Sequence, residues 1–191
     1  MLSLLLIRSG RTEYDCQGRI QGTLDIPLSE DGRLEVQAGA AELLDKHAKF
    51  SALYAGPCRS VQETAEILAE RLKLKLKTID DLHNLNQGLW QGMLFDEVKA
   101  KQPKVYRQWH EKPDTVCPPE GETLQDARER LRKALAKLAK KHKTGTVALV
   151  LGQPLASILR CMLHDDPSPA VCHVECAQAP LWEQLEVPAA V

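Results

Sequence analysis

The amino-acid sequence predicts an α/β domain built around a mostly parallel sheet. Short apolar runs alternate with longer segments in which apolar residues recur at helical spacing, and this alternation is typical of β-α-β units. The length of 191 residues is enough for one domain with a substantial core. The apolar fraction of 43% and the charged fraction of 27% are ordinary for a globular protein.

The first strand and the first long helix are predicted close to the N-terminus. Residues 2–7 form an apolar run that leads into Gly and Thr, which is the pattern of a strand buried on both faces. Residues 32–46 carry apolar side chains at helical spacing and predict a helix. The predicted buried face of this helix consists of Leu34, Ala38, Ala41 and Leu44.

A strand, a helix and an edge strand are predicted next. Residues 51–56 form a short apolar strand, and the helix over residues 57–72 begins with Pro57, which suits a first helical turn. Residues 72–79 alternate by twos, which predicts a half-exposed edge strand. The apolar face of the helix consists of Val61, Ala65, Leu68 and Leu72.

Residues 80–119 interrupt this alternation. The stretch is irregular, with Trp90 and Trp109 between short polar pieces, and it predicts an inserted helical lid rather than a separate domain. Both tryptophans are interpreted as packing residues. One domain is therefore predicted over residues 1–191, with the lid at about 80–119.

The last third of the sequence predicts two helices around a buried strand. Residues 121–143 give the clearest helix, because Thr123 and Asp126 form a capping pattern and leucines recur at helical spacing. A strongly apolar strand over residues 146–152 and a helix over residues 154–164 follow.

The loops after the two most apolar strands are expected to face one pocket. One of these strands leads into Arg8, Ser9 and Gly10, and the other leads into Gly152 and Gln153. In parallel sheets, ligands bind beyond the carboxyl ends of the strands. The sequence therefore predicts a polar site where these two loops meet.

Composition argues against several classes of function. The net charge is −1 and the basic residues are dispersed, so neither nucleic acid nor a membrane is predicted as a partner. No apolar run approaches the about 20 residues of a membrane-spanning helix. The 6 cysteines, without a secretory signal, are interpreted as reduced thiols of a cytoplasmic protein. No metal-ligand spacing and no dinucleotide fingerprint is present, so neither a metal nor a cofactor is predicted.

The N-terminal stretch resembles the opening motif of the histidine phosphatase superfamily, the phosphoglycerate-mutase-like group. Later segments resemble further parts of the same pattern, at residues 56–72, 82–92, 118–131 and 147–160. The resemblance implies a three-layer sandwich in which the lid sets substrate choice. The residues that match the opening motif in register are Arg8, Gly10, Thr12, Gly18, Arg19, Gln21, Gly22, Asp25, Pro27, Leu28, Ser29 and Gly32.

The resemblance also implies a chemistry, and this chain lacks its reactive groups. In the family, a first His attacks phosphorus, two Arg and a second His hold the phosphoryl oxygens, and a Glu protonates the leaving oxygen. The nucleophilic His position is occupied by Ser9, and the second His position by Gln153. The second Arg position is occupied by Ser60, with Arg59 one residue early, and the Glu position by Asn84.

These replacements predict a degenerate member of the family that lacks both active-site histidines, a catalytically inactive pseudophosphatase acting as a binding or regulatory module. The expected partners are a small phosphorylated or polar ligand and a protein. Because Asp15 replaces a loop Asn and only one Arg of the set remains, affinity for a dianionic phosphate should be weak, and a less charged or sugar-like ligand should fit better. No catalytic residue is predicted, and the predicted anion-binding residues are Arg8, Ser9, Asp15, Ser60, Asn84 and Gln153.

Two alternatives to this interpretation remain open. One is a phosphatase or phosphotransferase that acts on a small phosphoester through a nucleophile foreign to the family, and the other is a structural subunit that assembles with an active relative. Ser9 as a nucleophile needs a general base, which Gln153 cannot provide and which Asp15 would provide at the cost of repelling phosphate. Cys58 is interpreted as a packing residue and His83 as a rim or surface residue.

Overall fold

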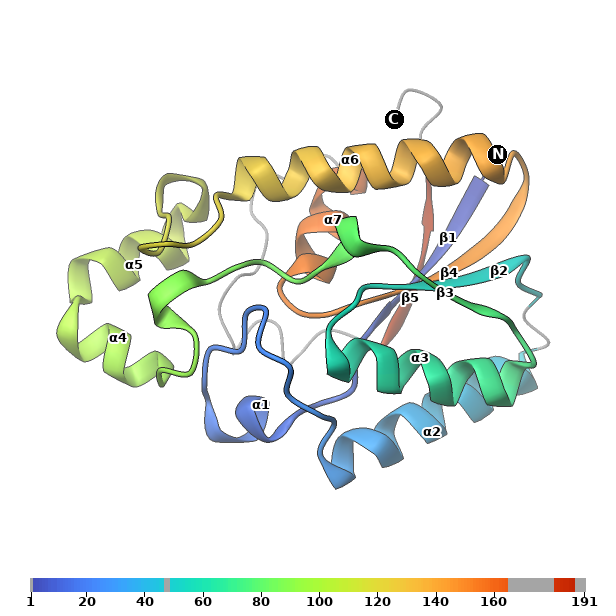
Figure 1. The fold of residues 1–191 in the computed structure, drawn as a ribbon, viewed down its shortest axis with the longest axis horizontal. Coiled ribbons are helices and arrows are strands. Elements are labelled where there is room, and N and C mark those ends of the chain that lie inside the picture. Colours follow the sequence, from blue (N-terminus) through green and yellow to red (C-terminus); the bar gives the residue numbers. More distant parts are fainter. Residues whose placement is uncertain (1, 47–48, 165–180, 188–191) are drawn as a thin grey trace.

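The computed structural model describes residues 2–46, 49–164 and 181–187, and its centre is a five-stranded sheet in the order β3-β2-β4-β1-β5 (Figure 1). Neighbouring strands from β3 to β1 pair in parallel, and β5 pairs antiparallel to β1. The predicted α/β class with a mostly parallel sheet is therefore confirmed. The strands are β1 (Leu2–Arg8), β2 (Ala52–Ala55), β3 (Leu76–Thr78), β4 (Gly145–Leu151) and β5 (Trp182–Glu186).

Two layers of helices cover the sheet. Helices α6 (Leu124–Lys141) and α7 (Leu155–His164) lie above it in Figure 1, and α2 (Glu30–Asp45) and α3 (Arg59–Leu72) lie below it. Successive side chains of a strand point to opposite faces. Accordingly, Leu4 and Leu6 of β1 belong to the core under α6 and α7, whereas Leu5 and Ile7 belong to the core over α2 and α3. The three-layer arrangement follows from this alternation.

The predicted buried face of α2 is wrong. Leu34 and Leu44 are 58% and 44% exposed, and the alanines predicted beside them are exposed as well. The helix instead buries a stripe of mostly small residues, because its first turn lies against the loop that follows β1. At Gly32 an added Cβ would lie 2.0 Å from the Arg11 carbonyl oxygen, so only glycine fits this approach. The buried residues of α2 are Gly32, Val36, Gly39, Ala40 and Leu43.

Other predicted elements are confirmed in type, although α3 begins at Arg59 rather than at Pro57 and β3 is limited to Leu76–Thr78, and one strand was missed. The α6 helix begins after Thr123, whose hydroxyl accepts a hydrogen bond from the Asp126 backbone N–H at 3.1 Å. Strand β3 is an edge strand, as its alternation predicts. Strand β5 was not predicted, because within its charged sequence only Leu185 is buried.

Residues 80–119 fold into short helices, of which α4 (Phe95–Lys101) and α5 (Pro103–Glu111) lie at one end of the molecule (Figure 1). Their aromatic side chains pack together: Trp90 and Trp109 are buried in an edge-to-face pair with centroids 5.2 Å apart, and Phe95 stacks on Trp109 at 5.9 Å. The predicted packing role of both tryptophans is confirmed, and the role of the segment as a lid stays a prediction. The other helices of this stretch are η1 (Asp80–Leu82), η2 (Gly88–Trp90) and η3 (Pro113–Thr115).

Within the described ranges, the helices are all too short or too polar to cross a bilayer.

Candidate active site

A cavity of about 280 Å³ lies where β1 and β4 end. The two strands run in register to Arg8 and Leu151, and the Ser9 backbone N–H donates to the Leu151 carbonyl oxygen at 2.8 Å. The two loops that follow therefore begin side by side at the same edge of the sheet. Arg8 and Ser9 line the cavity together with Gly152 and Gln153. The prediction of a pocket shared by these two loops is confirmed.

All of the predicted anion-binding residues line this one cavity, although they come from distant parts of the sequence. The β1 and β4 loops supply Ser9 and Gln153, the short helix α1 (Glu13–Gln17) supplies Asp15, and the first turn of α3 supplies Ser60. Anion binding by these residues stays a prediction. The lining residues that were not predicted are Arg11, Cys16, Gln21, Cys58 and Val61.

The loop after β1 is held against α2 and α3. The Gly10 backbone N–H donates to the Thr64 hydroxyl at 3.1 Å, and a Cβ added to Gly10 would lie 2.6 Å from the Gly32 carbonyl oxygen. Thr12 caps α1, where its backbone N–H and hydroxyl both donate to Asp15 Oδ2, at 2.7 and 2.8 Å. The backbone of this loop is therefore pre-organised around Ser9.

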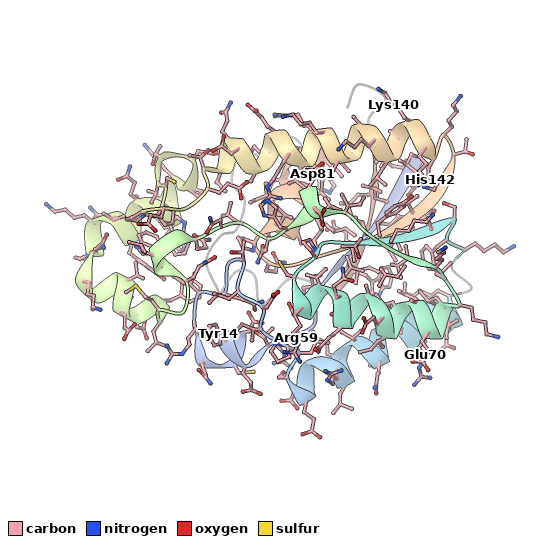
Figure 2. The ribbon with its side chains drawn as sticks, viewed as in Figure 1. Tyr14, Arg59, Glu70, Asp81, Lys140 and His142 are labelled. Atoms are coloured by element: carbon pink, nitrogen blue, oxygen red, sulfur yellow. The ribbon has the colours of Figure 1, made fainter. Side chains whose placement is uncertain are left out.

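Two arginines beside the cavity share one carboxylate of α2. Arg8 Nη2 forms a close ion pair with Glu35 Oε1, and Arg11 Nε lies 3.7 Å from Glu35 Oε2, which is too long for a hydrogen bond. The exposed fraction of the side chain is 12% for Arg8, 51% for Arg11 and 23% for Glu35. A second guanidinium at the cavity was not predicted, although Arg11 lies in the same loop as Arg8. Arg59 does not supply it: this side chain is 58% exposed at the start of α3 (Figure 2), where it pairs with Glu63 at 3.1 Å.

Asn84 holds several segments together behind the cavity. Its Nδ2 donates to the carbonyl oxygens of Gly22 at 2.9 Å and Gln153 at 2.7 Å. Its Oδ1 accepts from the backbone N–H groups of Leu85 at 2.9 Å and Leu155 at 3.3 Å. Both hydrogens of the Asn84 amide therefore take part in hydrogen bonds within the protein, and neither is available to the anion that Asn84 was expected to bind.

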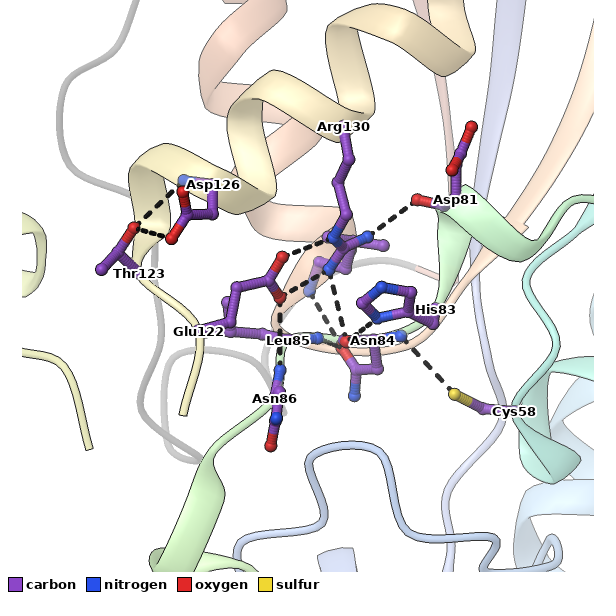
Figure 3. Close-up of polar contacts among 11 residues, drawn as sticks. Cys58, Asp81, His83, Asn84, Leu85, Asn86, Glu122, Thr123, Asp126 and Arg130 are labelled. Atoms are coloured by element: carbon purple, nitrogen blue, oxygen red, sulfur yellow. Dashed lines mark hydrogen bonds and ion pairs between the residues drawn. The ribbon is translucent and has the colours of Figure 1, made fainter. Parts of the chain in front are cut away.

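The backbone around Asn84 is held in turn by an ion pair from α6 (Figure 3). Arg130 binds Glu122 through two nitrogens, at 2.6 and 2.9 Å, and donates to the carbonyl oxygens of Asp81 at 2.9 Å and Asn84 at 3.3 Å. His83 Nδ1 lies 2.9 Å from the Asn84 carbonyl oxygen, and His83 does not line the cavity. Hydrogen bonds and an ion pair therefore hold the backbone of this wall of the cavity in place.

Ser9 and Gln153 keep hydrogen-bonding groups for a ligand. Gln153 Oε1 accepts from the Ser157 backbone N–H at 3.3 Å and from its hydroxyl at 2.9 Å, so it caps the start of α7. Among the described residues, neither Gln153 Nε2 nor the Ser9 hydroxyl has a hydrogen-bond partner. Ser60 is buried, and its hydroxyl accepts from Gln21 Nε2 at 3.4 Å.

Cys58 precedes α3 and lines the cavity with part of its side chain. It is 5% exposed and packs in the core with Val61 and Ala65, as predicted. Burial raises the pKa of the Cys58 thiol, although the Asn84 backbone N–H donates to its Sγ at 3.5 Å. The thiol is therefore held protonated, which makes it a poor nucleophile.

The family of the chain follows from a match over almost its whole length. The histidine phosphatase superfamily (branch 1) matches residues 4–181. The chain belongs to this superfamily. Phosphoserine phosphatase 1 of Hydrogenobacter thermophilus is 34% identical over 150 residues, which cover 78% of this chain and 70% of that protein. Glucosyl-3-phosphoglycerate phosphatase of Mycobacterium tuberculosis is 34% identical over 135 residues, which cover 71% of this chain and 59% of that protein.

Solved structures of the superfamily share the fold. The mycobacterial glucosyl-3-phosphoglycerate phosphatase solved with VO3 superimposes with a TM-score of 0.82 at 29% identity, over 96% of this chain and 90% of that chain. The relatives named above are called phosphatases, and this finding contradicts the prediction that this histidine phosphatase superfamily member is catalytically inactive. That prediction was wrong because it compared residue types with the family chemistry alone. The described residues form a cavity that is lined by two arginines and by Ser9, whose hydroxyl has no partner among them.

Proposed function

We propose that the chain is a phosphatase that transfers the phosphoryl group of a small phosphomonoester to Ser9 and then to water. It does so without the two histidines that the family chemistry uses, since Ser9 and Gln153 occupy their positions. The observation that carries the proposal is the Ser9 hydroxyl, which lies in the cavity at the nucleophile position of the motif and has no partner among the described residues. The names of the relatives support the reaction class.

Asp15 is the proposed general base, and it is the one carboxylate among the described residues that line the cavity. Asp15 takes the hydroxyl proton as the Ser9 Oγ–P bond forms and the P–O bond to the leaving group breaks, and the leaving oxygen takes a proton from solvent because it lies on the opposite side of phosphorus. Water next attacks the phosphoserine from that opposite side and gives up a proton to solvent. As the Ser9 Oγ–P bond breaks, Asp15 returns its proton to Ser9 Oγ and inorganic phosphate leaves. Because Thr12 holds only Oδ2 of this carboxylate, Oδ1 is left for the transfer.

The anion-binding groups in this proposal are Arg8, Arg11, Gln153 Nε2 and the first turn of α3. The α3 helix begins at the cavity with Ser60, and the positive end of a helix dipole stabilises a phosphoryl group. Asn84 contributes by holding the Gln153 backbone rather than by touching the anion. These groups stabilise the charge that develops on the phosphoryl oxygens, which is the main source of catalysis in phosphoryl transfer.

The substrate in this proposal is small. A cavity of about 280 Å³ is at the lower end of the volumes that hold metabolites. The relatives act, by their names, on phosphoserine and on a glycosylated phosphoglycerate, which are small phosphomonoesters. A cytoplasmic location belongs to the same proposal, and it is supported by the free thiols of Cys16, Cys58, Cys117 and Cys161.

Turnover of para-nitrophenyl phosphate by the purified chain tests the proposal. Ser9→Ala should lower kcat by about 10³ or more, because removal of a nucleophile that works with a base has an effect of that order. Ser51→Ala is the matched control, since Ser51 is exposed and donates to the Thr146 carbonyl oxygen away from the cavity. Acid-quenched turnover followed by mass spectrometry should locate the phosphoryl group on Ser9.

Two results would contradict the proposal. A folded protein with no phosphomonoesterase activity would contradict the proposed reaction. Full activity in Ser9→Ala, or loss of activity in Cys58→Ser alone, would remove Ser9 as the nucleophile.

A further inference from the structure

The charges at the cavity balance before any substrate is bound. Arg8 and Arg11 are the cations of its described lining and Asp15 is its carboxylate, while Glu35 lies behind both arginines and pairs with each of them. Two positive and two negative side chains therefore meet here. A site built to hold a doubly charged phosphoryl group is expected to have an excess of positive charge instead.

Glu35 is partly shielded, since 23% of its side chain is exposed, so its charge acts on the site more strongly than a surface charge would. Among the described residues its Oε2 has no hydrogen-bond partner, and this atom has almost no contact with solvent; the Arg8 side chain paired with Oε1 is 12% exposed. Water screens a pair in such a place less than a pair on the surface. An anion that drew Arg8 away from Glu35 would leave this carboxylate without its close ion pair and with Arg11 at 3.7 Å, which is costly.

Among the described residues, the neighbouring charges do not give the cavity an excess of positive charge. A small second cavity on the far side of Arg8 and Gln153 is lined by Arg160 of α7 and Glu183 of β5, which are again of opposite sign. On the Cys58 side of the cavity, the charged groups that act on the thiol are Asp25 and Arg130. Arg130 is itself paired with Glu122.

The remaining ligand-facing groups suit a single negative charge. The Ser9 hydroxyl and Gln153 Nε2 are neutral donors, and neutral donors are about half as strong toward an anion as charged ones. Asp15 repels an unprotonated phosphoryl oxygen. A protonated one, by contrast, donates a hydrogen bond to that carboxylate. The Asp15 carboxylate can thus accept a hydrogen bond from the P–OH group of a singly charged phosphate.

We propose that Glu35 holds Arg8 and Arg11 in a charge-balanced set that selects the singly charged form of the phosphoryl group over the doubly charged form. The inference rests on the proposed phosphatase function, because it names the ionic form of that substrate. Glu35 acts through the arginines and is therefore a positioning residue.

Calorimetric binding of inorganic phosphate from about pH 5.5 to about pH 8.5 tests this selection without turnover, since phosphate loses its second proton within that range. The dissociation constant of the unaltered protein should rise by about tenfold for each pH unit above that pKa. Sulfate has the same shape and keeps two charges throughout, so it should bind weakly at every pH. The charge of sulfate does not change over this pH range, so any pH dependence of sulfate binding comes from titration of the protein. That dependence is used to correct the phosphate measurements.

Glu35→Gln should weaken this selection by removing the negative charge that pairs with Arg8 and Arg11. Binding of phosphate at the alkaline end should become at least about tenfold tighter, and sulfate should bind measurably. Glu42→Gln is the matched control, because Glu42 lies on the same helix and pairs with Lys46 at 2.8 Å on the surface. Glu42→Gln should leave the dissociation constants of phosphate and sulfate unchanged.

An equal or tighter dissociation constant for phosphate at the alkaline end in the unaltered protein would overturn the selection, whatever the variant does. That outcome leaves hydrolysis by Ser9 standing. Conversely, absence of turnover together with the predicted pH dependence would remove the proposed phosphatase and keep the selection of a singly charged anion.

Discussion

The two walls of the cavity use their replaced residues in opposite ways. On the β1 side, the Ser9 hydroxyl has no partner among the described residues, and Arg11 is half exposed. On the other side, Asn84 makes four hydrogen bonds through its side chain and is 3% exposed. A polar side chain of the lining thus lacks a protein partner among the described residues on one wall and is fully hydrogen-bonded on the other. Substitutions should accordingly change activity at the first wall and stability at the second.

Arg130→Met should give the largest loss of stability, about 3 kcal/mol, because it leaves Glu122 partly buried without its ion pair. The carbonyl oxygens of Asp81 and Asn84 would also lose their donor. Urea denaturation measures the change. The matched control is Arg128→Met on the same helix, whose partner Asp114 is 43% exposed and whose loss should be below about 1 kcal/mol. Equal losses in the two variants would show that the wall does not depend on this pair.

Asn84→Ala should lower the free energy of unfolding by about 2 kcal/mol, since it leaves buried backbone groups without partners. Asn86→Ala is the control, because Asn86 is only half buried and its side chain makes two hydrogen bonds, at 2.9 and 3.4 Å. A loss of activity in Asn84→Ala without a loss of stability would place Asn84 on the chemical wall instead. Asn84→Glu should not raise activity or stability, because the carboxylate would face the carbonyl oxygens of Gly22 and Gln153.

Part of the cavity lining could be predicted from sequence because backbone register determines which loops meet there. Arg8, Ser9 and Gln153 follow neighbouring parallel strands, and strand ends meet at one edge of a sheet. Asp15, Ser60 and the remaining predicted residues were placed by the motif, and they line the same cavity.

The charge of the site could not be predicted in the same way. Glu35 reaches Arg8 and Arg11 only because α2 packs against the β1 loop through Gly32, and the sequence pattern placed Leu34 and Leu44 on the buried face instead. The assignment of inactivity had a similar cause. Residue types do not show which hydroxyl or amide hydrogens are used in hydrogen bonds within the fold, and Ser9 and Asn84 differ in that respect.

Ser9→Ala should change the free energy of unfolding by no more than about 0.5 kcal/mol, because the hydroxyl has no protein partner among the described residues to lose. Ser60→Ala is the companion variant. Ser60 is 2% exposed and accepts from Gln21, so its loss should reach about 1 kcal/mol. Denaturant unfolding of both variants, beside the turnover of Ser9→Ala, separates the chemical wall from the structural one. A larger loss of stability in Ser9→Ala than in Ser60→Ala would reverse the assignment of the walls.

The smallest effect is expected at His142, which lies at the end of α6 before β4, away from the cavity (Figure 2). Burial lowers the pKa of His142, and the nearby charges of Lys141 and Lys77 lower it further. The unfolded chain therefore binds the His142 proton more tightly than the folded chain does, so the free energy of unfolding should fall as the pH drops through the ordinary value of 6.5. His142→Gln should remove this part of the pH dependence, in urea unfolding at about pH 7.5 and about pH 5.5. Because Glu35 and Asp15 are untouched by this change, the pH dependence of phosphate binding should stay as it is, which separates titration of the scaffold from titration of the ligand. A change in that binding profile would mean that the two ends of the sheet are coupled.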